Sequence, residues 1–476
     1  MRRPLLILMV SLMNGCAVGP NYVRPDTPAA AQFKEAAGWK LADPNDQLPR
    51  GNWWEIYGDA QLNDLMQQVE VSNQTIKQAE AQYRAARALV QSARAASFPT
   101  ISANAAADRN RGASSRFLTS GPGQTSRVST TYNVSLDASW ELDVWGRLRR
   151  ASESAQAGAD ASAADLAAAR LSMQSELAQN YFQLRVTESE KSYLDDEIAG
   201  FQRSLIITQN QYAVGVAKRS DVLQAQTQLK STQAQSLDLQ ITRSQLEHAT
   251  AVLVGKNPSA FSLAEQPLTA AVPATPIGVP SALLERRPDI AAAERRVIAA
   301  NAQIGVARAA YFPSLSLSGT LGYQNSSIDN LIAAANRVWS VGPALALTLF
   351  DAGAHRAATR QAIATYDANV AAYRQTTLAA FQDVEDNLVA LRVLGDEQAV
   401  QDAATQAARE SEAIALNQYK AGTVSYLDVV IAQSTALANA RRSITIRGRH
   451  LLASVALFKA LGGGWTAADP VRPTAQ

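Results

Sequence analysis

The chain has 476 residues with 44 Lys or Arg against 42 Asp or Glu, so its formal net charge at pH 7 is only +2. This balance argues against the concentrated basic surface of a nucleic-acid-binding protein, and no apolar run reaches the ~18 residues that a membrane-spanning helix needs. The single cysteine excludes an intrachain disulfide, and the three histidines lie too far apart to suggest a metal site. We therefore expect neither a metal nor a cofactor.

The N-terminus has the pattern of an export signal. Residues 1–15 combine a basic start, a short apolar stretch and the small residue Gly15 directly before Cys16. A lone cysteine at this position predicts lipid attachment at Cys16. Ala17, where an acidic residue would hold a lipoprotein at the inner membrane, predicts sorting to the outer membrane. The alternative is an ordinary signal peptide with a chance cysteine, because residues 13–15 match the usual pre-cysteine sequence only loosely.

The first half of the mature chain predicts a helix, two strands, a long helix and a shorter helix. The first helix covers 60–97 and ends at a Phe-Pro pair, since proline removes a backbone donor. Apolar and polar residues alternate over 129–143, the period of a strand with one apolar face. The long helix covers 147–215, and at ~1.5 Å per residue it would be a rod of roughly 100 Å. A turn at Gly215 leads into a helix over 217–254.

The second half repeats these elements about 210 residues later. Its predicted helix over 286–311 is followed by an alternating segment over 312–324, a long helix over 354–421, a turn at Gly422 and a helix over 424–461. The matched motifs include Asn210-Gln211-Tyr212 with Asn417-Gln418-Tyr419, Asp221-Val222 with Asp428-Val429, and Phe98-Pro99 with Phe312-Pro313. A period this long does not fit a solenoid, so it predicts a duplicated half-molecule.

These elements predict an α+β membrane protein that works as an oligomer. Four strands per chain cannot close a membrane barrel, and strand edges left open in lipid would have unsatisfied backbone groups. Three chains would share 12 strands and a long helical coiled-coil barrel, so we predict a homotrimer with cyclic symmetry. We assign residues 1–15 to the signal peptide, 16–59 to the lipid-anchored segment and collar, 60–270 to the first repeat, 271–461 to the second and 462–476 to the tail.

Three segments carry a family resemblance: Cys16-Ala17-Val18-Gly19-Pro20-Asn21-Tyr22, Leu283-Leu284-Glu285-Arg286-Arg287-Pro288-Asp289-Ile290, and Ala460-Leu461-Gly462-Gly463-Gly464-Trp465. With them the chain resembles the outer membrane factor (TolC-like) family, in its NodT-type lipoprotein branch. The resemblance implies a homotrimeric channel-tunnel with a 12-stranded barrel in the outer membrane and a helical barrel across the periplasm. It also implies docking onto a periplasmic membrane-fusion adaptor fed by an inner-membrane pump, commonly of the resistance-nodulation-division class. We expect Pro288 and Asp289 to start a helix and the arginines to tie the collar to neighbouring helices.

The resemblance places the periplasmic mouth at the two hairpin tips. The first tip contains Tyr212, Gly215, Lys218, Arg219 and Asp221, and the second contains Tyr419, Gly422, Leu427, Asp428 and Ile431. Three copies of Asp428 would form a negative ring that favours cations, and Leu427 would narrow the same aperture. Ile431 stands where family members often have an acidic residue, so it would add an apolar constriction. We also expect Asp221 to belong to the gate. The alternative for both Asp221 and Asp428 is that they cap the helices that follow each turn.

Several functions fit these features. The favoured one is passive export of drugs or other small toxic compounds through an outer-membrane channel. A conduit for type I protein secretion would have the same fold, and a pore-free, lipid-anchored periplasmic coiled-coil protein would have the helices without the strands. No phosphate-binding loop, nucleophile elbow or catalytic triad indicates an enzyme, and we expect the acidic residues on the helices to be solvated.

Overall fold

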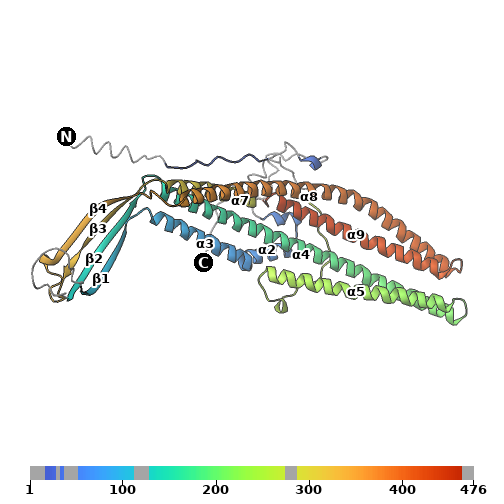
Figure 1. Ribbon diagram of the computed structural model, residues 1–476. Coiled ribbons are helices and arrows are strands. Elements are labelled where there is room, and N and C mark those ends of the chain that lie inside the picture. The colour runs from blue at the N-terminus through green and yellow to red at the C-terminus, as the bar shows by residue number, and fades with distance from the viewer. Residues whose placement is uncertain (1–16, 28–32, 37–51, 112–127, 274–286, 464–476) are drawn as a thin grey trace, which may run out of the picture. The chain divides into compact units, whose positions relative to one another are not determined.

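The structure is a computed structural model that describes residues 17–27, 33–36, 52–111, 128–273 and 287–463 (Figure 1). The predicted signal peptide and Cys16 lie outside these residues, as do Leu283 to Arg286 and Gly464-Trp465 of the family motifs. No helix in the described ranges combines the length and the apolar character needed to cross a membrane.

Both halves contain the predicted order of helix, strand pair, long helix and shorter helix. The helices are α2 (Ala60–Ser72), α3 (Gln74–Ala95), α4 (Arg147–Ala213), α5 (Arg219–Leu253), α7 (Pro288–Ala309), α8 (Ala354–Lys420) and α9 (Tyr426–Ala460). The strands are β1 (Thr100–Arg111), β2 (Val128–Leu142), β3 (Ser314–Asn325) and β4 (Arg337–Ala346). Short 3-10 turns are η1 (Lys34–Ala36), η2 (Trp53–Tyr57), η3 (Pro258–Ala260) and η4 (Ala334–Asn336).

Two compact units divide the chain. The first comprises Met1–Pro25, Tyr83–Ala161 and Ala293–Ala372 and contains the whole sheet. The second comprises Asp26–Gln82, Ser162–Ala292 and Tyr373–Gln476 and contains the far ends of both long helices with α5 and α9. Each unit therefore draws on both sequence repeats.

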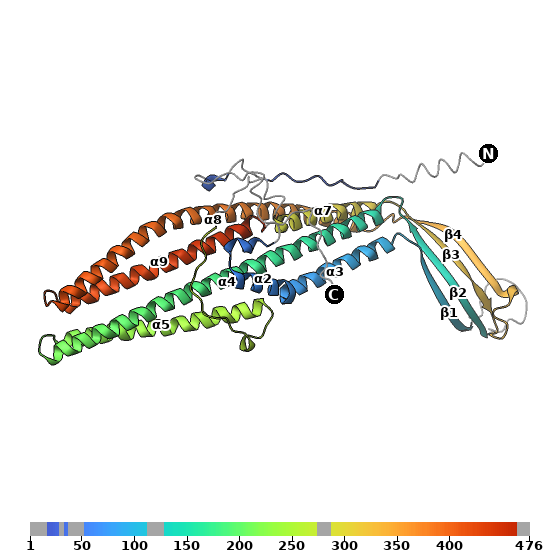
Figure 2. The same ribbon diagram turned by 180° about the vertical axis from the view of Figure 1, so that it is seen from behind.

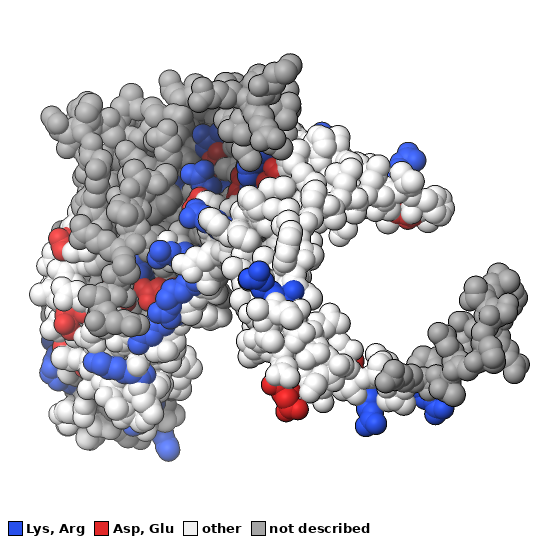
Figure 3. Space-filling model, turned by 90° about the vertical axis from the view of Figure 1, so that its left-hand side faces the viewer, with Lys and Arg blue, Asp and Glu red and all other residues white. Residues whose placement is uncertain are grey.

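The sheet of the first unit is an antiparallel meander in the order β1-β2-β3-β4. Leu136 lies opposite Leu321, and the next pair along the strands is Asp137 opposite Thr320. Because side chains alternate along a strand, these pairs belong to opposite faces. One face carries Ile101, Leu136, Trp140, Leu142, Leu315, Leu317, Leu321 and Leu345, and the other carries Asn104, Ser135, Asp137, Ser316, Ser318 and Thr320. Figure 3 looks onto the strand end, where charged side chains are few and scattered.

Polar side chains on the second face bind one another across the strands. The Asp137 carboxylate of β2 accepts hydrogen bonds from the Thr320 hydroxyl of β3 at 2.6 Å and from the Asn104 amide of β1 at 2.7 Å. The sheet thus has one apolar and one hydrogen-bonding face, as the alternation in the sequence predicts.

The helix expected over 60–97 is interrupted at Asn73, so the prediction of one continuous helix is wrong. Asn73 is buried, and its side-chain amide donates to the Leu253 carbonyl at 2.8 Å while its oxygen accepts from the Ile76 backbone amide. An Asn side chain that bonds the backbone in this way competes with the helical ladder. Gly255 packs on the same break, where an added Cβ would lie 2.4 Å from the Ser72 carbonyl oxygen. The break therefore accommodates the end of α5.

The second unit is held together by aromatic packing and by a seam between the hairpins. Trp53 is fully buried and stacks on Phe458 with ring centroids 5.9 Å apart, and the Tyr57 hydroxyl lies 2.8 Å from the Ser454 hydroxyl. Farther along α4, Leu194 and Phe201 pack in one cluster with Leu229 of α5 and Leu437 of α9. The spacing of three and four residues along α4 thus marks a buried stripe. The α4–α5 and α8–α9 hairpins turn at the same end of this unit (Figures 1 and 2).

Of the two arginines expected to tie the collar to neighbouring helices, Arg287 lies within the described residues and connects the start of α7. Its guanidinium donates to Asp289 at 2.7 Å, to Asp383 of α8 at 3.0 Å and to the Ala460 carbonyl at 3.2 Å. The start of α7 is therefore tied to α8 and to the end of α9.

Candidate functional site at the hairpin tips

The first tip is a tight turn followed by a capped helix. Gly215 has a φ of +79°, a conformation that a residue with a Cβ rarely adopts. The Asp221 carboxylate accepts from the Lys218 backbone amide at 3.1 Å, and the Asp221 amide donates back to the Lys218 carbonyl at 3.0 Å. Asp221 thus satisfies a backbone donor at the start of α5.

The second tip has the same construction. Gly422 has a φ of +73°, and the Asp428 carboxylate accepts from the Ser425 amide at 3.0 Å and from the Ser425 hydroxyl at 2.7 Å. The capping role considered for Asp428 is therefore present in the structure. Capping does not exclude a further electrostatic role, because the Asp428 side chain remains exposed.

Leu427, Asp428 and Ile431 lie on the exposed side of α9. Leu427 is 51% exposed and Ile431, one turn later, is 56% exposed, whereas Val429 between them is fully buried. Their counterparts in the first repeat are Ser220 and Gln224. The second hairpin therefore presents two apolar side chains at positions where the first has Ser220 and Gln224.

Tyrosines connect the second tip to the first hairpin. Tyr419 and Tyr426 are buried with ring centroids 5.1 Å apart, and they pack with Ala225 of α5 and Val429. Burial raises the pKa of the Tyr426 hydroxyl to about 12, with Tyr419 and Asp221 adding to the rise and Thr208 opposing it. Asp221 thus lies close enough to the tyrosine pair to act on it electrostatically.

The other predicted tip residues are distributed differently. Tyr212 is 48% exposed, and Lys218 and Arg219 are exposed, unlike the buried Tyr419. Among the described residues of one protomer, neither Lys218 nor Arg219 forms an ion pair with Asp428, whose carboxylate binds Ser425 instead. Tyr419 therefore packs inside the protomer, whereas Tyr212, Lys218 and Arg219 are exposed at the surface of the first tip.

Two acidic residues of different hairpins, Glu412 and Glu197, lie near each other. Burial raises the pKa of Glu412 on α8 to about 7, helped by the charge of Glu197 on α4 and opposed by Arg409 and Gln433. The Arg409 guanidinium lies over the Tyr193 ring, 5.6 Å from its centroid. The charge of Glu412 therefore changes near neutral pH.

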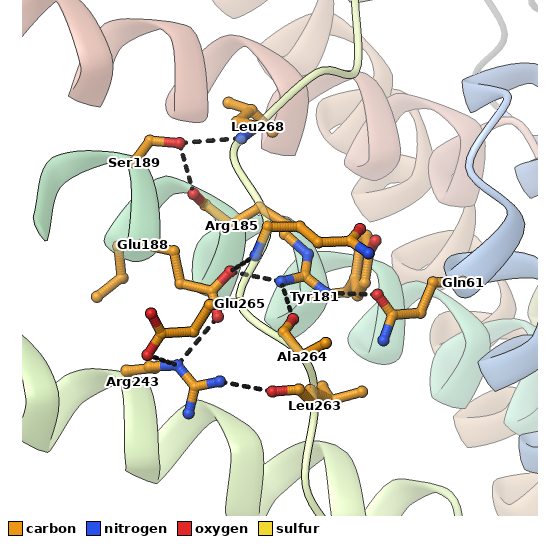
Figure 4. Close-up of polar contacts among 12 residues, drawn as sticks. Gln61, Tyr181, Arg185, Glu188, Ser189, Arg243, Leu263, Ala264, Glu265 and Leu268 are labelled. Carbon is orange, nitrogen blue, oxygen red and sulfur yellow. Dashed lines mark hydrogen bonds and ion pairs between the residues drawn. The ribbon is translucent and has the colours of Figure 1, made fainter. Parts of the chain in front are cut away.

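A buried ionic cluster on α4 was missed from the sequence, and Glu188 contradicts the expectation that the acidic residues of the helices are solvated (Figure 4). Arg185 is 2% exposed and bonds Glu188, the Ala264 carbonyl at 3.0 Å and the Gln61 amide oxygen at 2.6 Å. Buried charges persist when they are paired and hydrogen-bonded in this way. The cluster joins α4 to α2 and to the segment after η3.

Arg243 of α5 completes the cluster. It donates to Glu188 at 3.0 Å and to the Leu263 carbonyl at 2.7 Å, while Leu268 donates to the Ser189 hydroxyl at 3.0 Å (Figure 4). The extended segment 263–268 is thereby attached to both helices of the first hairpin.

The second repeat lacks this cluster. Counterparts of Glu188 and Arg243 are Gly395 and His450, and a Cβ added to Gly395 would lie 3.6 Å from the imidazole. Burial lowers the pKa of His450, which favours its neutral form. The counterpart of Arg185, Arg392, is 42% exposed and pairs with Glu35. Glu188 and Arg243 are charged, and their counterparts in the second repeat are not acidic or strongly basic. This difference between the repeats is the sequence signal that would have revealed the cluster.

In the first unit, the segment that follows Cys16 packs at the junction of strands and helices. The Val18 amide donates to the Trp145 carbonyl at 3.1 Å, and a Cβ on Gly19 would lie 2.5 Å from the Gly305 Cα. The Arg150 guanidinium donates to the Asn21 side chain at 2.8 Å.

This attachment continues along α7. Tyr22 and Arg24 both donate to the Glu294 carboxylate at 3.0 Å.

No grouping of His, Cys, Asp or Glu suited to a metal ion occurs within the ranges that the structure covers.

Comparison with known proteins places the chain among outer-membrane efflux proteins. Residues 65–256 and 279–463 match the profile described as outer membrane efflux protein. The chain is 31% identical over 469 residues to the toluene efflux pump outer membrane protein TtgC of Pseudomonas putida, covering 98% of this chain and 96% of that protein. It is 31% identical over 476 residues to outer membrane protein OprJ of Pseudomonas aeruginosa, covering 98% and 97%. The outer-membrane channel OprN superimposes with a TM-score of 0.88 at 34% identity, covering 94% of this chain and 100% of that chain. The predicted family and fold class are confirmed.

Proposed function

Because this chain belongs to the outer membrane efflux protein family, we propose that it is the exit duct for drugs or other small toxic compounds in a tripartite system with a periplasmic adaptor and an inner-membrane pump. It is an outer-membrane channel and not an enzyme. Outer membrane efflux proteins act as trimeric channels within tripartite pumps, and the four strands described here are one third of a 12-stranded barrel. The observation that carries the proposal is the sheet, with one apolar face for lipid and one polar face for a water-filled lumen.

The proposed gate is the exposed side of α9 near the second tip. Leu427 and Ile431 supply an apolar constriction, and Asp428 supplies a charge on the same surface. In a trimer, three copies of this surface around the axis would restrict passage and favour cations. Asp221 adds a second negative charge from the first tip, near enough to Tyr426 to contribute to the raised pKa of its hydroxyl.

The proposed docking surface for the adaptor is the outer surface of the tips. Tyr212, Lys218 and Arg219 are exposed there, next to Val214 and Val216, which are 75% and 72% exposed. Gly215 and Gly422 set the turn geometry that presents these side chains. We propose a pump of the resistance-nodulation-division class as the source of cargo.

Lipid attachment at Cys16 is a second part of the proposal. The contacts of Val18, Gly19 and Asn21 fix the start of the described chain beside the end of β2 and the beginning of α4. An acyl group on Cys16 would give this fixed segment a lipid anchor. Mass spectrometry of the mature N-terminus tests this directly, since an unmodified Cys16 contradicts it. The assignment of 1–15 to the signal peptide and the repeat boundaries at 60–270 and 271–461 remain predictions.

The functional test is restoration of efflux. The full chain would be produced with a resistance-nodulation-division pump and its adaptor in a strain that lacks its own outer-membrane efflux proteins. We expect higher tolerance to toluene or antibiotics with the wild type and no gain with a Gly422→Pro variant, which cannot form the turn. Unchanged tolerance, together with secretion of a protein substrate when type I components are supplied, would contradict efflux and favour the secretion conduit.

A further inference from the structure

The charged side chains of the four strands are divided between the two faces of the sheet. The arginines are Arg109, Arg111 and Arg337, and the acidic residues are Asp108, Asp137 and Glu141. Arg109 lies opposite Thr130 on the apolar face of β2, and Arg111 is on the same face two positions later. Arg337 lies opposite Tyr323, which the register of β2 and β3 also places on the apolar face. The acidic residues align with the alternate positions of β2, so the arginines occupy the apolar face and the acidic residues the polar face.

The arginines lie at the strand ends that are farthest from the helices. Arg109 and Arg111 are at the end of β1 and Arg337 begins β4, whereas α3, α4, α7 and α8 follow or precede the opposite strand ends. All three side chains are exposed. In an outer-membrane channel whose helices lie in the periplasm, these strand ends belong to the external side of the barrel.

An apolar band separates the arginines from the helix end of the sheet. Leu142 and Tyr132 lie on the apolar face of β2, about ten residues apart. At ~3.3 Å per residue and a strand tilt of about 35–45°, this span is roughly 25 Å high, which is the height of the apolar band of an outer-membrane barrel. Tyr132 therefore stands at the outer limit of the band, where aromatic side chains gather at membrane interfaces. Arg109 lies opposite Thr130, one position farther out on the same face, and so reaches the level of the lipid headgroups.

Assembly of the trimer gathers the arginines into clusters. Strands β1 and β4 are the two edges of the sheet, and the end of β1 lies at the same end of the sheet as the start of β4. When three chains share one barrel, β4 of one copy runs beside β1 of the next. Arg337 of one copy then joins Arg109 and Arg111 of its neighbour on the lipid side of each seam.

We propose that each arginine cluster binds the phosphate groups of a phosphorylated lipid in the outer leaflet of the outer membrane. Guanidinium groups bind phosphate oxygens through paired hydrogen bonds, and basic side chains beside a membrane attract anionic headgroups. The acyl chains of the same lipid cover the apolar band, in which Trp339 is 71% exposed and Leu136 is 53% exposed. The inference rests on the trimeric channel of the proposed function.

The division of charge between the faces favours lipid over cargo as the ligand. The strand arginines all lie on the face turned away from the lumen, so an anion that passes through the barrel does not meet them. The lumen face carries the acidic residues instead, among them Asp137, whose carboxylate binds Thr320 and Asn104.

The test is lipid binding to full-length trimers, measured by native mass spectrometry in detergent. The probes are lipid A with two phosphates, lipid A with one phosphate and a dephosphorylated form. We expect the wild type to bind the doubly phosphorylated form most tightly. The variant Arg109→Gln/Arg337→Gln should lower that affinity about 30-fold, because each basic side chain beside a headgroup adds to binding. The matched control is Arg84→Gln/Arg203→Gln, which removes two exposed arginines of α3 and α4 and should leave the affinity unchanged.

Three results would overturn the inference. Equal affinity of the wild type for the three forms would attribute lipid binding to the apolar face alone. Displacement of lipid A by inorganic phosphate would assign the arginines to free anions. Unchanged affinity in Arg109→Gln/Arg337→Gln would show that these arginines do not hold the phosphates. If this variant yields no trimers, the order of the three forms on the wild type decides.

Conductance of the same preparations in planar bilayers keeps the proposed function separate. We expect wild-type and Arg109→Gln/Arg337→Gln trimers to conduct alike, because the arginines do not line the lumen. Conducting trimers without phosphate-dependent binding would overturn the lipid site alone. Trimers that bind lipid A through the arginines but do not conduct would contradict the channel and leave the lipid site in place.

Discussion

Arg441 of α9 binds Glu190 of α4, with its Nε 2.6 Å from the carboxylate oxygen. The same guanidinium donates to the Gln235 amide oxygen of α5 at 2.7 Å. One side chain of the second hairpin is thus attached to both helices of the first. If the proposed mouth widens by movement of the two hairpins relative to each other, this connection would resist its opening.

Removing the connection should loosen the hairpins. Arg441→Ala and Glu190→Ala are each expected to increase the open probability of the channel, and the double variant should have little further effect because both remove one pair. The measurement is single-channel recording of all three variants. The control is Arg442→Ala, whose side chain is 67% exposed and pairs within its own hairpin with Glu397. Additive effects of Arg441→Ala and Glu190→Ala would show that the pair does not act as a unit.

Substitutions of Asp428 can separate its two roles, capping of α9 and supply of a negative charge to the proposed gate. Asp428→Asn keeps an acceptor oxygen for the Ser425 amide and removes the charge, whereas Asp428→Ala removes both. We expect the ratio of cation to anion permeability to fall in both variants. Only the alanine variant should also lose helix stability, by about 1 kcal/mol.

Bi-ionic reversal potentials measure this ratio. Asp221→Asn is the companion variant, because Asp221 has the same cap position without the apolar pair beside it, and we expect a smaller fall in the ratio from it. An unchanged permeability ratio in Asp428→Asn would show that Asp428 acts only as a helix cap.

Glu412 should make the contact between hairpins depend on pH. Its pKa in the folded protein is about 7, above the ordinary value of 4.5, so between these values the folded state binds more protons than the unfolded state. Stability therefore falls as pH rises through this window, and above about pH 7 the full penalty of the ionised carboxylate is present. We expect trimers to dissociate at a higher temperature at pH 5.5 than at pH 8.

The variant Glu412→Gln is expected to flatten this dependence. The groups that face Glu412 are Glu197 of α4 together with Arg409 and Gln433, so Glu197→Gln should flatten it in part. Glu410→Gln, on the exposed side of α8, provides the control. A pH profile in Glu412→Gln identical to that of the wild type would assign the effect to another group.

The ionic cluster of the first repeat should contribute far more to stability than its counterpart in the second. Arg185→Ala leaves the buried Glu188 with one cationic partner fewer, and such losses typically cost about 3–5 kcal/mol. The matched variant is Arg392→Ala, which removes a half-exposed pair with Glu35 and should cost about 0–1 kcal/mol. Limited proteolysis and thermal dissociation of trimers give the comparison. Equal losses of stability in the two variants would show that the burial of Arg185 does not increase its contribution to stability.

Much of this architecture follows from local patterns in the sequence. The long helices end within two residues of the predicted positions because Gly215 and Gly422 mark their turns, and β2 follows the alternation over 129–143. The family and its fold were identified from three short motifs. The break at Asn73 was not predicted because its cause, a hydrogen bond to Leu253, lies 180 residues away in the chain.

At the tips, too, features set by neighbouring residues were predicted from the sequence, and features set by distant segments were not. The sequence placed Asp221 and Asp428 at cap positions, and the structure has both carboxylates on backbone amides. It could not assign Tyr419 to the interior, because the residues that bury it come from the first hairpin and from α9. Burial of Glu188 likewise depends on Arg243 and on the segment after η3.

Single-channel conductance of the purified full-length protein in planar bilayers tests most directly whether it is a channel. We expect stepwise cation-favouring conductance from trimers, with larger or longer openings in Asp428→Asn and in Leu427→Ala/Ile431→Ala. Absence of conductance from trimers of the wild type and of both variants would contradict a channel and favour a pore-free periplasmic coiled-coil protein.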